Sequence, residues 1–202
     1  TKCESLTLVV GGEALLVERA VDSVVQRARK VDPQTERRDL DATEQGVVGR
    51  IDEACSPTLF GGGAVVVIDN VESADESVVA AIVAAAAQAS DEVAIVALHA
   101  GGARGKKLLD KLSQAAGNRV DCVEIKKGRG ISDFVSAEVK AAKRSMSPQA
   151  QSILIAAVGS DVRALASAVS QLANDIESRE IEADDVSRYF GGTVDVTATI
   201  TY

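Results

Sequence analysis

Over its first 128 residues, the sequence alternates short apolar runs with longer amphipathic stretches. This alternation is typical of parallel strands joined by helical crossovers, because buried parallel strands are apolar on both faces. The runs that predict strands are 6–10, 37–40, 64–68, 93–98 and 120–125. The stretches that predict helices are 13–30, 43–54 (capped by Asp41 or Thr43), 75–89 and 106–116. We therefore predict an α/β domain over residues 1–128, built on a doubly wound, five-stranded parallel sheet.

The pattern changes after a charged link at residues 126–130, Lys-Lys-Gly-Arg-Gly. No strand pattern recurs beyond it, and the apolar spacing predicts helices over 131–144, 147–158, 161–177 and 183–189. Ser147 is the expected cap of the second of these helices, with Pro148 in its first turn. We predict a small all-helical domain over residues 131–192 and a linker over residues 193–202, which fit neither pattern.

The cysteines and the apolar runs limit where the chain acts. Cys3, Cys55 and Cys122 are odd in number and widely spaced, which argues against a disulfide framework and against a zinc site. No apolar run approaches the ~20 residues that span a bilayer. No basic start followed by an apolar core indicates a secretory signal. We predict a cytoplasmic protein that does not contact a membrane.

Two glycine-containing loops are candidates for a nucleotide-binding site. A phosphate-binding loop needs glycines that expose backbone N–H groups, a lysine that meets the phosphates, and a hydroxyl that holds magnesium. The turn Gly11-Gly12-Glu13 has no lysine, and the loop 100–107 lacks the first glycine and has Lys107 in place of the hydroxyl. We therefore predict that the chain uses no nucleotide or other cofactor. An active P-loop ATPase that uses the loop from Gly101 to Lys107 is the alternative.

Two polar residues follow apolar runs, and neither completes a catalytic site. Asp69 directly follows the apolar run 64–68, which is the position of the magnesium-binding acid in ATPases. The next residue is Asn70, where an ATPase would usually have the acid that serves as its catalytic base. We interpret Asp69 as a residue that caps the turn. His99 follows the next run without a nearby Cys or second His, and we interpret it as a loop histidine. The sequence thus predicts no metal site and no catalytic site.

An apolar pair stands in a segment rich in Pro and Gly. The chain has no Trp, three Phe and two Tyr, so we expect each aromatic residue to have a specific structural or binding role. Leu59 and Phe60 follow Pro57 and Thr58 and precede three glycines. One interpretation is that Phe60 tucks under the sheet as a core residue. The other is that Leu59 and Phe60 project as anchors for a partner's pocket, where they would contribute roughly 3–6 kcal/mol to binding.

Charge is unevenly distributed along the chain. The formal net charge of -8 argues against non-specific nucleic-acid binding by the whole surface. From Arg104 to Arg129, however, eight basic residues outnumber three acidic ones. This basic stretch is a candidate contact for DNA or for a neighbouring subunit, and the sequence does not choose between the two.

Taken in order, these motifs resemble the delta subunits of the bacterial DNA polymerase III clamp loader. The resemblance covers the chain from residue 6 to about residue 192. The segments that carry it are 11–13, 56–60 ahead of the apolar run 65–69, 159–165 at the start of a helix, and 182–186.

The resemblance implies an AAA+-like fold, in which a RecA-like α/β domain is followed by a helical lid domain; the family's collar domain would be absent. It also implies that the chain binds the β sliding clamp and opens its ring during DNA replication, without binding ATP itself. Leu59 and Phe60 match the two main residues of the clamp-binding plug, with Pro57 and Thr58 beside them. Arg163 matches the second-sensor arginine of active AAA+ ATPases and is expected to be structural here.

The resemblance also names partners. These are the β sliding clamp, the gamma/tau and delta-prime subunits of the loader and, indirectly or weakly, primer–template DNA. The family is part of the DNA-directed DNA polymerase III holoenzyme, so the enzyme class stays open, although we expect no catalytic site in this chain. A non-catalytic structural adaptor with a buried Phe60 remains the other alternative.

Overall fold

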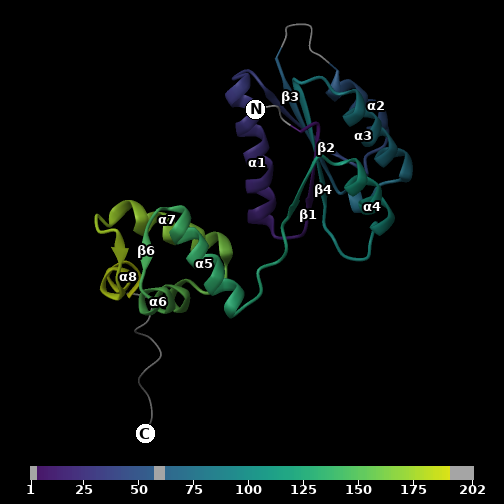
Figure 1. The fold of residues 1–202 in the computed structure, drawn as a ribbon. Coiled ribbons are helices and arrows are strands. Elements are labelled where there is room, and N and C mark those ends of the chain that lie inside the picture. Colours follow the sequence, from purple (N-terminus) through teal and green to yellow (C-terminus); the bar gives the residue numbers. More distant parts are fainter. Residues whose placement is uncertain (1–3, 57–61, 192–202) are drawn as a thin grey trace. The chain divides into compact units, whose positions relative to one another are not determined.

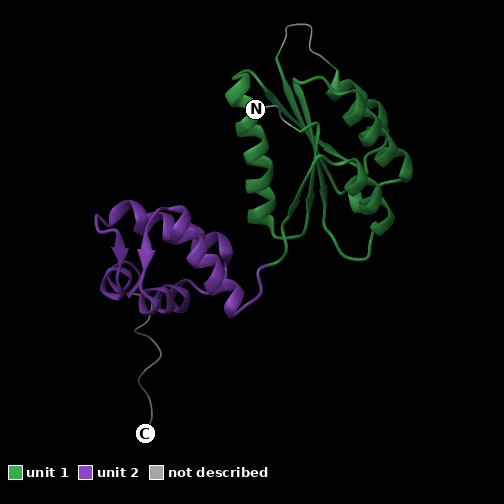
Figure 2. Cartoon of the chain, in the orientation of Figure 1, with its two compact units in different colours: residues 1–124 green, residues 125–202 purple. Residues whose placement is uncertain are grey.

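The computed structural model describes residues 4–56 and 62–191. The chain divides into two compact units, residues 1–124 and residues 125–202 (Figure 2). Each unit has its own buried apolar side chains.

Unit 1 is built on a parallel sheet whose strand order is β2-β3-β4-β1-β5. The strands are β1 (Leu6–Val10), β2 (Glu36–Asp41), β3 (Ala64–Asp69), β4 (Val93–His99) and β5 (Asn118–Asp121). Every hydrogen-bonded strand pair in this sheet is parallel. The prediction of an α/β fold on a five-stranded parallel sheet is confirmed.

Helices cover both faces of this sheet (Figure 1). They are α1 (Ala14–Val31) on one face and α2 (Val47–Cys55), α3 (Glu76–Gln88) and α4 (Lys106–Ala115) on the other, with a short 3-10 turn, η1 (Val71–Ser73), before α3. Alternate residues of β3 enter different cores: Val65 and Val67 pack in the cluster with α1, and Val66 packs in the cluster with the other three helices. Burial on both faces explains the unbroken apolar run.

Two boundaries in unit 1 differ from the predicted ones by four residues, and the others differ by two residues or fewer. The last strand ends at Asp121: the N–H of Cys122 still donates to the carbonyl of Val10, but the carbonyl of Cys122 accepts a hydrogen bond from the N–H of Glu13, outside the strands, at 3.1 Å. Helix α2 begins at Val47, because the Asp41 carboxylate binds the N–H and hydroxyl of Thr43 and forms a turn there. Asp41 therefore caps a turn and does not cap the helix.

Unit 2 consists of helices and one very small sheet. The helices are α5 (Arg129–Ala141), α6 (Pro148–Val158), α7 (Val162–Asp175) and α8 (Ala183–Phe190). As predicted, Pro148 stands in the first turn of α6 and the Ser147 side chain accepts a hydrogen bond from the N–H of Ala150 at 3.2 Å. The expectation that no strands recur is wrong, because β6 (Ser145–Met146) pairs with β7 (Glu180–Ile181). Two-residue strands are too short to show a period in sequence.

Candidate functional site

The predicted partner-binding residues Pro57, Thr58, Leu59 and Phe60 lie outside the described residues. The structure does describe the chain on both sides of them. Ser56 is the last described residue before this segment, and Gly62 is the first described residue after it. The geometry of these two flanks defines how the segment is attached to unit 1.

The first flank is the C-terminal end of α2, which the edge strand β2 holds in place. Arg38 of β2 donates a hydrogen bond from Nη1 to the carbonyl oxygen of Ala54 at 2.8 Å, and its Nη2 pairs with the Glu36 carboxylate at 3.0 Å. The Ser56 hydroxyl donates to the carbonyl of Asp52 at 2.7 Å. The last carbonyls of a helix have no partner within the helix and carry partial negative charge. The guanidinium of Arg38 therefore fixes the end from which the segment departs.

The second flank is fixed by a carboxylate and by close backbone packing. The N–H of Gly63 donates to Oδ2 of Asp32 at 2.8 Å. A Cβ at Gly63 would lie 2.7 Å from the carbonyl oxygen of Glu92, so only glycine fits there. Hydrogen bonds from the backbone N–H groups of Gln34 and Gly63 lower the pKa of Asp32, because they stabilise its charged form.

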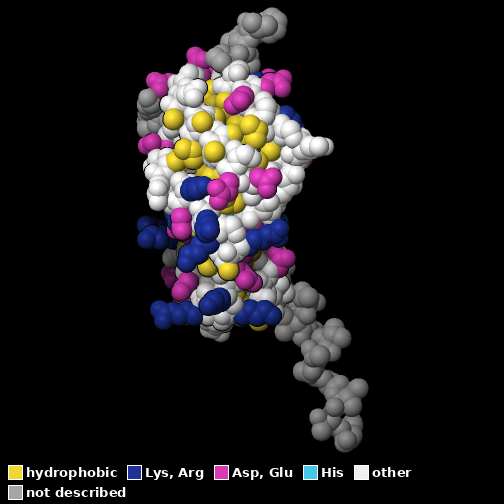
Figure 3. Space-filling view, turned by 90° about the vertical axis from the view of Figure 1, so that its right-hand side faces the viewer, with side chains coloured by type: hydrophobic (Ala, Val, Ile, Leu, Met, Phe, Trp, Pro, Cys, Tyr) yellow, Lys and Arg dark blue, Asp and Glu magenta, His cyan; other side chains and the backbone are white. Residues whose placement is uncertain are grey.

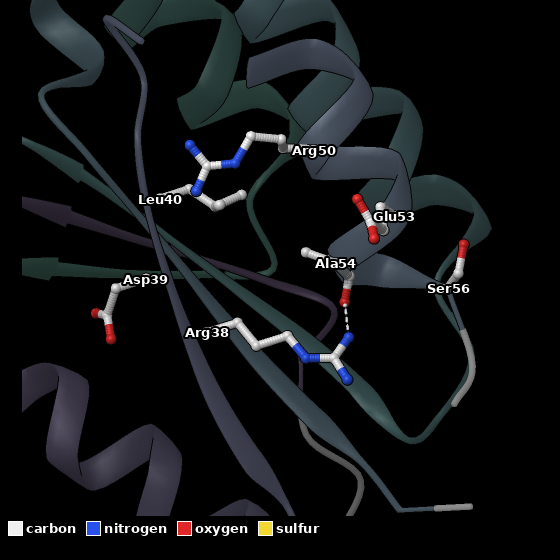
Figure 4. Close-up of a pocket in the computed structure, with 7 residues that line it drawn as sticks. All are labelled: Arg38, Asp39, Leu40, Arg50, Glu53, Ala54 and Ser56. Carbon is white, nitrogen blue, oxygen red and sulfur yellow. Dashed lines mark hydrogen bonds between the residues drawn. The ribbon is translucent and has the colours of Figure 1, made fainter. Parts of the chain in front are cut away.

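A hollow of about 520 Å³ lies beside the first flank (Figure 4). Its lining residues come from β2, from α2 and from the residue after α2; they are Arg38, Asp39, Leu40, Arg50, Glu53, Ala54 and Ser56. Figure 4 shows the Arg38 guanidinium reaching the Ala54 carbonyl, close to the end of the helix. Arg50 also pairs with Glu44. Two basic and two acidic side chains without a nucleophile–base pair suit binding to a surface better than they suit catalysis.

Sequence reasoning did not identify Arg38 or Asp32 as parts of this site. Both act through backbone groups that are distant in sequence, at Ala54 and Gly63. Charged residues are common in edge strands, where they prevent pairing with a strand of another chain. The presence of Arg38 in the sequence therefore did not indicate a role at this site.

The turn after β1 uses its backbone N–H groups within the protein. The N–H of Gly11 donates to the carbonyl of His99 at 2.9 Å, and that of Glu13 donates to the carbonyl of Cys122 at 3.1 Å. A Cβ at Gly11 would lie 2.0 Å from the Cys122 oxygen, so the glycine serves this close backbone approach. In a phosphate-binding loop such N–H groups face the ligand.

The second glycine loop is organised by His99. The prediction of a loop histidine is wrong, because His99 is the last residue of β4 and only 1% exposed. Its Nδ1 accepts a hydrogen bond from the N–H of Gly101 at 2.9 Å, and its Nε2 lies 3.3 Å from the carbonyl oxygen of Gly105. This pattern places the ring proton on Nε2. The N–H of Ala100 donates to Glu72 at 3.1 Å.

The strand-end acid Asp69 caps the turn, as interpreted from the sequence. Its Oδ1 accepts a hydrogen bond from the N–H of Asn70 at 2.7 Å, and the Asn70 side chain donates to Asp41 at 2.9 Å. Over residues 4–56 and 62–191, no group of three or more His, Cys, Asp or Glu side chains is arranged to hold a metal ion. Within the same ranges, no helix is long and apolar enough to cross a membrane.

Among the residues that the structure describes, three members of the basic stretch form ion pairs with acidic side chains. Lys111 pairs with Glu76 at 3.0 Å, which lowers the pKa of that carboxyl. The other two pairs are Arg119 with Asp121 at 2.9 Å and Arg129 with Asp133 at 3.6 Å. By contrast, Arg104, Lys106 and Lys107 are exposed at the start of α4. Arg163 lies exposed in the first turn of α7.

An apolar groove of about 490 Å³ runs between α3 and α4. Figure 3 views the face of unit 1 that carries these helices and shows apolar side chains gathered on it. The groove is lined by Val79, Ala80, Val83, Ala84, Ala87, Lys111, Gln114 and Ala115. Four of these eight residues are alanines.

Comparisons with known proteins place the chain by its fold. No protein-family profile and no curated protein matches the sequence. Among solved structures, the DNA clamp loader delta protein of Bacillus subtilis superposes with a TM-score of 0.71 and 20% identity, over 91% of this chain and 57% of that one. The Holliday junction branch migration motor RuvB of Thermotoga maritima gives a TM-score of 0.51 with 12% identity, over 93% of this chain and 61% of that one.

A third similar structure is C. elegans PCH-2, with a TM-score of 0.51 and 13% identity, over 95% of this chain and 60% of that one. This chain therefore spans less than two thirds of the length of each of these proteins. Together the likenesses confirm the predicted AAA+-like fold, a RecA-like parallel sheet followed by helices, and the resemblance to clamp loader delta at the level of fold.

Proposed function

We propose that this chain is a clamp-loader subunit of the delta type, which binds the β sliding clamp and opens its ring during DNA replication in the bacterial cytoplasm. The observation that carries the proposal is the likeness to the Bacillus subtilis clamp loader delta protein over 91% of the chain. The motifs quoted from the sequence support the same family independently of that superposition.

In this proposal Leu59 and Phe60 are the anchors that enter an apolar pocket of the clamp, with Pro57 and Thr58 at the edge of the contact. Arg38 and Asp32 hold the two flanks of their segment. Fixed flanks reduce the conformational entropy that binding must overcome. The chain then opens the ring because it has a higher affinity for the open clamp than for the closed one, which shifts the clamp's population.

We also propose that the chain works without ATP of its own. The support is that backbone N–H groups of both glycine loops already bind acceptors within the protein. The energy for loading would then come from other subunits, the gamma/tau and delta-prime proteins. Primer–template DNA would contact the chain weakly, through the exposed basic side chains Arg104, Lys106 and Lys107 at the start of α4.

The test is clamp binding by surface plasmon resonance, with the sliding clamp of the same organism on the chip. Leu59→Ala and Phe60→Ala should each weaken binding by roughly 2–4 kcal/mol, about thirtyfold or more, since both side chains fill one pocket. Val48→Ala is the matched control, because Val48 is an exposed apolar residue of the neighbouring helix α2. Thermal melting of each variant accompanies the binding measurement.

Two results would contradict the proposal. The first is a native chain that does not bind the clamp at all. The second is a Phe60→Ala variant that melts many degrees lower while its folded fraction binds the clamp normally. That second result would make Phe60 a core residue and would favour the structural adaptor.

A further inference from the structure

Strand β2 is an edge of the sheet in unit 1, and one side of its backbone faces away from β3. It pairs with β3 on one side, and no strand within the described residues pairs with it on the other. The N–H groups of Glu36 and Ala42 donate to carbonyls on the β3 side, at 3.0 and 2.9 Å. Backbone groups alternate in direction along a strand, so the N–H and C=O groups of Arg37 and Asp39 point to the free edge.

The charged side chains of β2 are anchored on the two faces of the sheet. Arg37 pairs with Asp39 at 2.8 Å and lies 3.9 Å from Asp22 of α1, on the α1 face. Arg38 reaches the Ala54 carbonyl of α2 on the other face, and Figure 4 shows Asp39 on the opposite side of the strand from Arg38. Charged side chains on an edge hinder pairing with another strand. Because these are drawn to the faces, they leave the exposed residues Arg37 and Asp39 open to a partner's backbone.

The hollow of about 520 Å³ lies along this edge, between β2 and α2. Its apolar floor is formed by Leu40 and Ala54, each 8% exposed. The guanidinium groups of Arg38 and Arg50 lie to either side of this floor (Figure 4). The side chain of Arg50 is 46% exposed. On this face the two arginines stand against one acid, Glu53, so the hollow has a basic excess.

An occupant has to fit both the backbone edge and the hollow. Backbone groups on a free edge pair with an extended chain that lies about 4.8 Å away. Every second side chain of that chain faces α2, at a spacing of about 7 Å. An apolar side chain over Leu40 and Ala54 would then have neighbours toward the two guanidinium groups. Carboxylates are the groups that guanidinium binds best.

We propose that the free edge of β2 binds an extended segment of another protein, which adds a strand to the sheet and places an apolar residue between two acidic ones on the side that faces α2. The edge selects an extended backbone, the hollow selects the apolar residue, and the arginines select the acids. A helical partner does not fit, because its backbone groups are bonded within the helix. The site consists of described residues and does not rest on the proposed function.

The first experiment measures amide hydrogen exchange by NMR in the full chain. The probe is the end-blocked peptide Thr-Glu-Thr-Val-Thr-Glu-Thr, which carries the proposed pattern on one face. At saturation the N–H groups of Arg37 and Asp39 should exchange about tenfold more slowly or less, since they become bonded. Those of Arg38 and Leu40 are the internal control, because they already face β3, and should change less than about twofold.

Three altered peptides test the backbone and the charge separately. A peptide with Lys in place of Glu should bind about tenfold more weakly or worse, because it meets Arg38 and Arg50. Two further peptides are N-methylated, one at its Thr residues and the other at its Glu and Val residues. Only one of these two sets faces β2, so one peptide should lose binding about tenfold or more while the other stays within about threefold.

Variants of the chain test the same contacts from the other side. Asp39→Pro removes an N–H at the free edge without removing a bond to β3, and should weaken peptide binding about tenfold or more. Asp39→Ala is the matched control, which keeps that N–H and should bind within about twofold of the native chain. Arg50→Ala should weaken binding about three- to tenfold. Thermal melting shows whether each variant is folded.

Four results would overturn the inference. They are no binding of the peptide at millimolar concentration, equal binding of the two N-methylated peptides, native binding by a folded Asp39→Pro variant, and unchanged exchange at Arg37 and Asp39. A dimer in light scattering with both amides already protected would also overturn it, because a second copy would then occupy the edge. Clamp binding is measured apart from these peptides, so failure of the proposed function leaves the inference standing.

Discussion

The carboxylate of Asp32 and the backbone N–H of Gly63 are joined by a hydrogen bond of 2.8 Å between residues that are 31 positions apart. The same carboxylate accepts a second hydrogen bond from the N–H of Gln34 at 2.9 Å. Asp32 thus ties the turn after α1 to the residue that leads into β3. Both bonds are to the charged carboxylate, and they lower its pKa in the folded chain.

This hydrogen bond predicts a pH dependence of stability. A carboxyl whose pKa is lower in the folded state stabilises the fold above its unfolded pKa, about 3.9, and the contribution is lost as the pH falls through the folded pKa. Asp32→Asn should therefore be less stable than the native chain at pH 7, and the difference should shrink in acid. Urea unfolding at pH 7 and at pH 3 measures both. Asp110→Asn, in an exposed position of α4, is the control; an equal loss at both pH values for Asp32→Asn would contradict the prediction.

A second prediction concerns the joint between Arg38 and Ala54. Arg38→Ala removes the hydrogen bond to the last turn of α2 and should lower the free energy of unfolding by about 1–2 kcal/mol. Arg37→Ala is the matched control, because Arg37 is the neighbouring arginine of β2 and pairs with the exposed carboxylates of Asp22 and Asp39. It should cost less than about 0.5 kcal/mol. Equal losses in the two variants would show that the helix-end contact has no special role.

The third prediction concerns the exposed basic side chains at the start of α4. Reversing Lys106 and Lys107 together to Glu should weaken binding to primer–template DNA about tenfold or more at low salt, and the effect should fade at high salt. Lys111 is left unchanged, because its ion pair with Glu76 would become a pair of carboxylates. Fluorescence anisotropy over a salt series is the measurement.

The matched control for this charge reversal is Lys30→Glu with Lys140→Glu, which changes the net charge equally at two exposed positions elsewhere. If the control pair weakens DNA binding as much as the α4 pair does, the effect belongs to net charge. The assignment of a DNA contact to α4 would then be wrong.

The parts of the fold that followed from sequence are those with strong local signals. The apolar run at 6–10 coincides with β1, and the run at 64–68 coincides with β3 to within one residue. Ser147 and Pro148 marked the start of α6 because capping is a local interaction. These signals need no knowledge of the tertiary structure, which is why they could be read directly.

The parts that could not be predicted depend on contacts between distant residues. Asp32 and Arg38 gave no local signal, since their partners Gly63 and Ala54 become neighbours only in the folded chain. The same holds for β6 and β7, which pair although they are distant in sequence. Each has only two residues, which is too short for a strand pattern to be recognised. His99 is polar at the end of an apolar run, and its burial depends on two glycine-loop partners. Tertiary hydrogen bonding therefore decided each of these features.

The last prediction is that the chain does not bind ATP saturably in the micromolar range. In the turn after β1, the N–H groups of Gly11 and Glu13 donate to backbone carbonyls, and no lysine follows them. In the second loop, the N–H of Gly101 donates to His99 and that of Ala100 donates to Glu72. A phosphate at either place would have to break these bonds and approach Glu13 or Glu72, which adds desolvation and charge repulsion.

Isothermal titration calorimetry with ATP and Mg²⁺ tests this expectation. Lys106→Ala with Lys107→Ala separates specific binding from general attraction, because the second loop has no other lysine that could meet a phosphate. The expected result is a flat titration for both the native chain and the double variant. A saturable heat signal in the native chain that disappears in the double variant would overturn the prediction and favour an ATPase that uses the second loop.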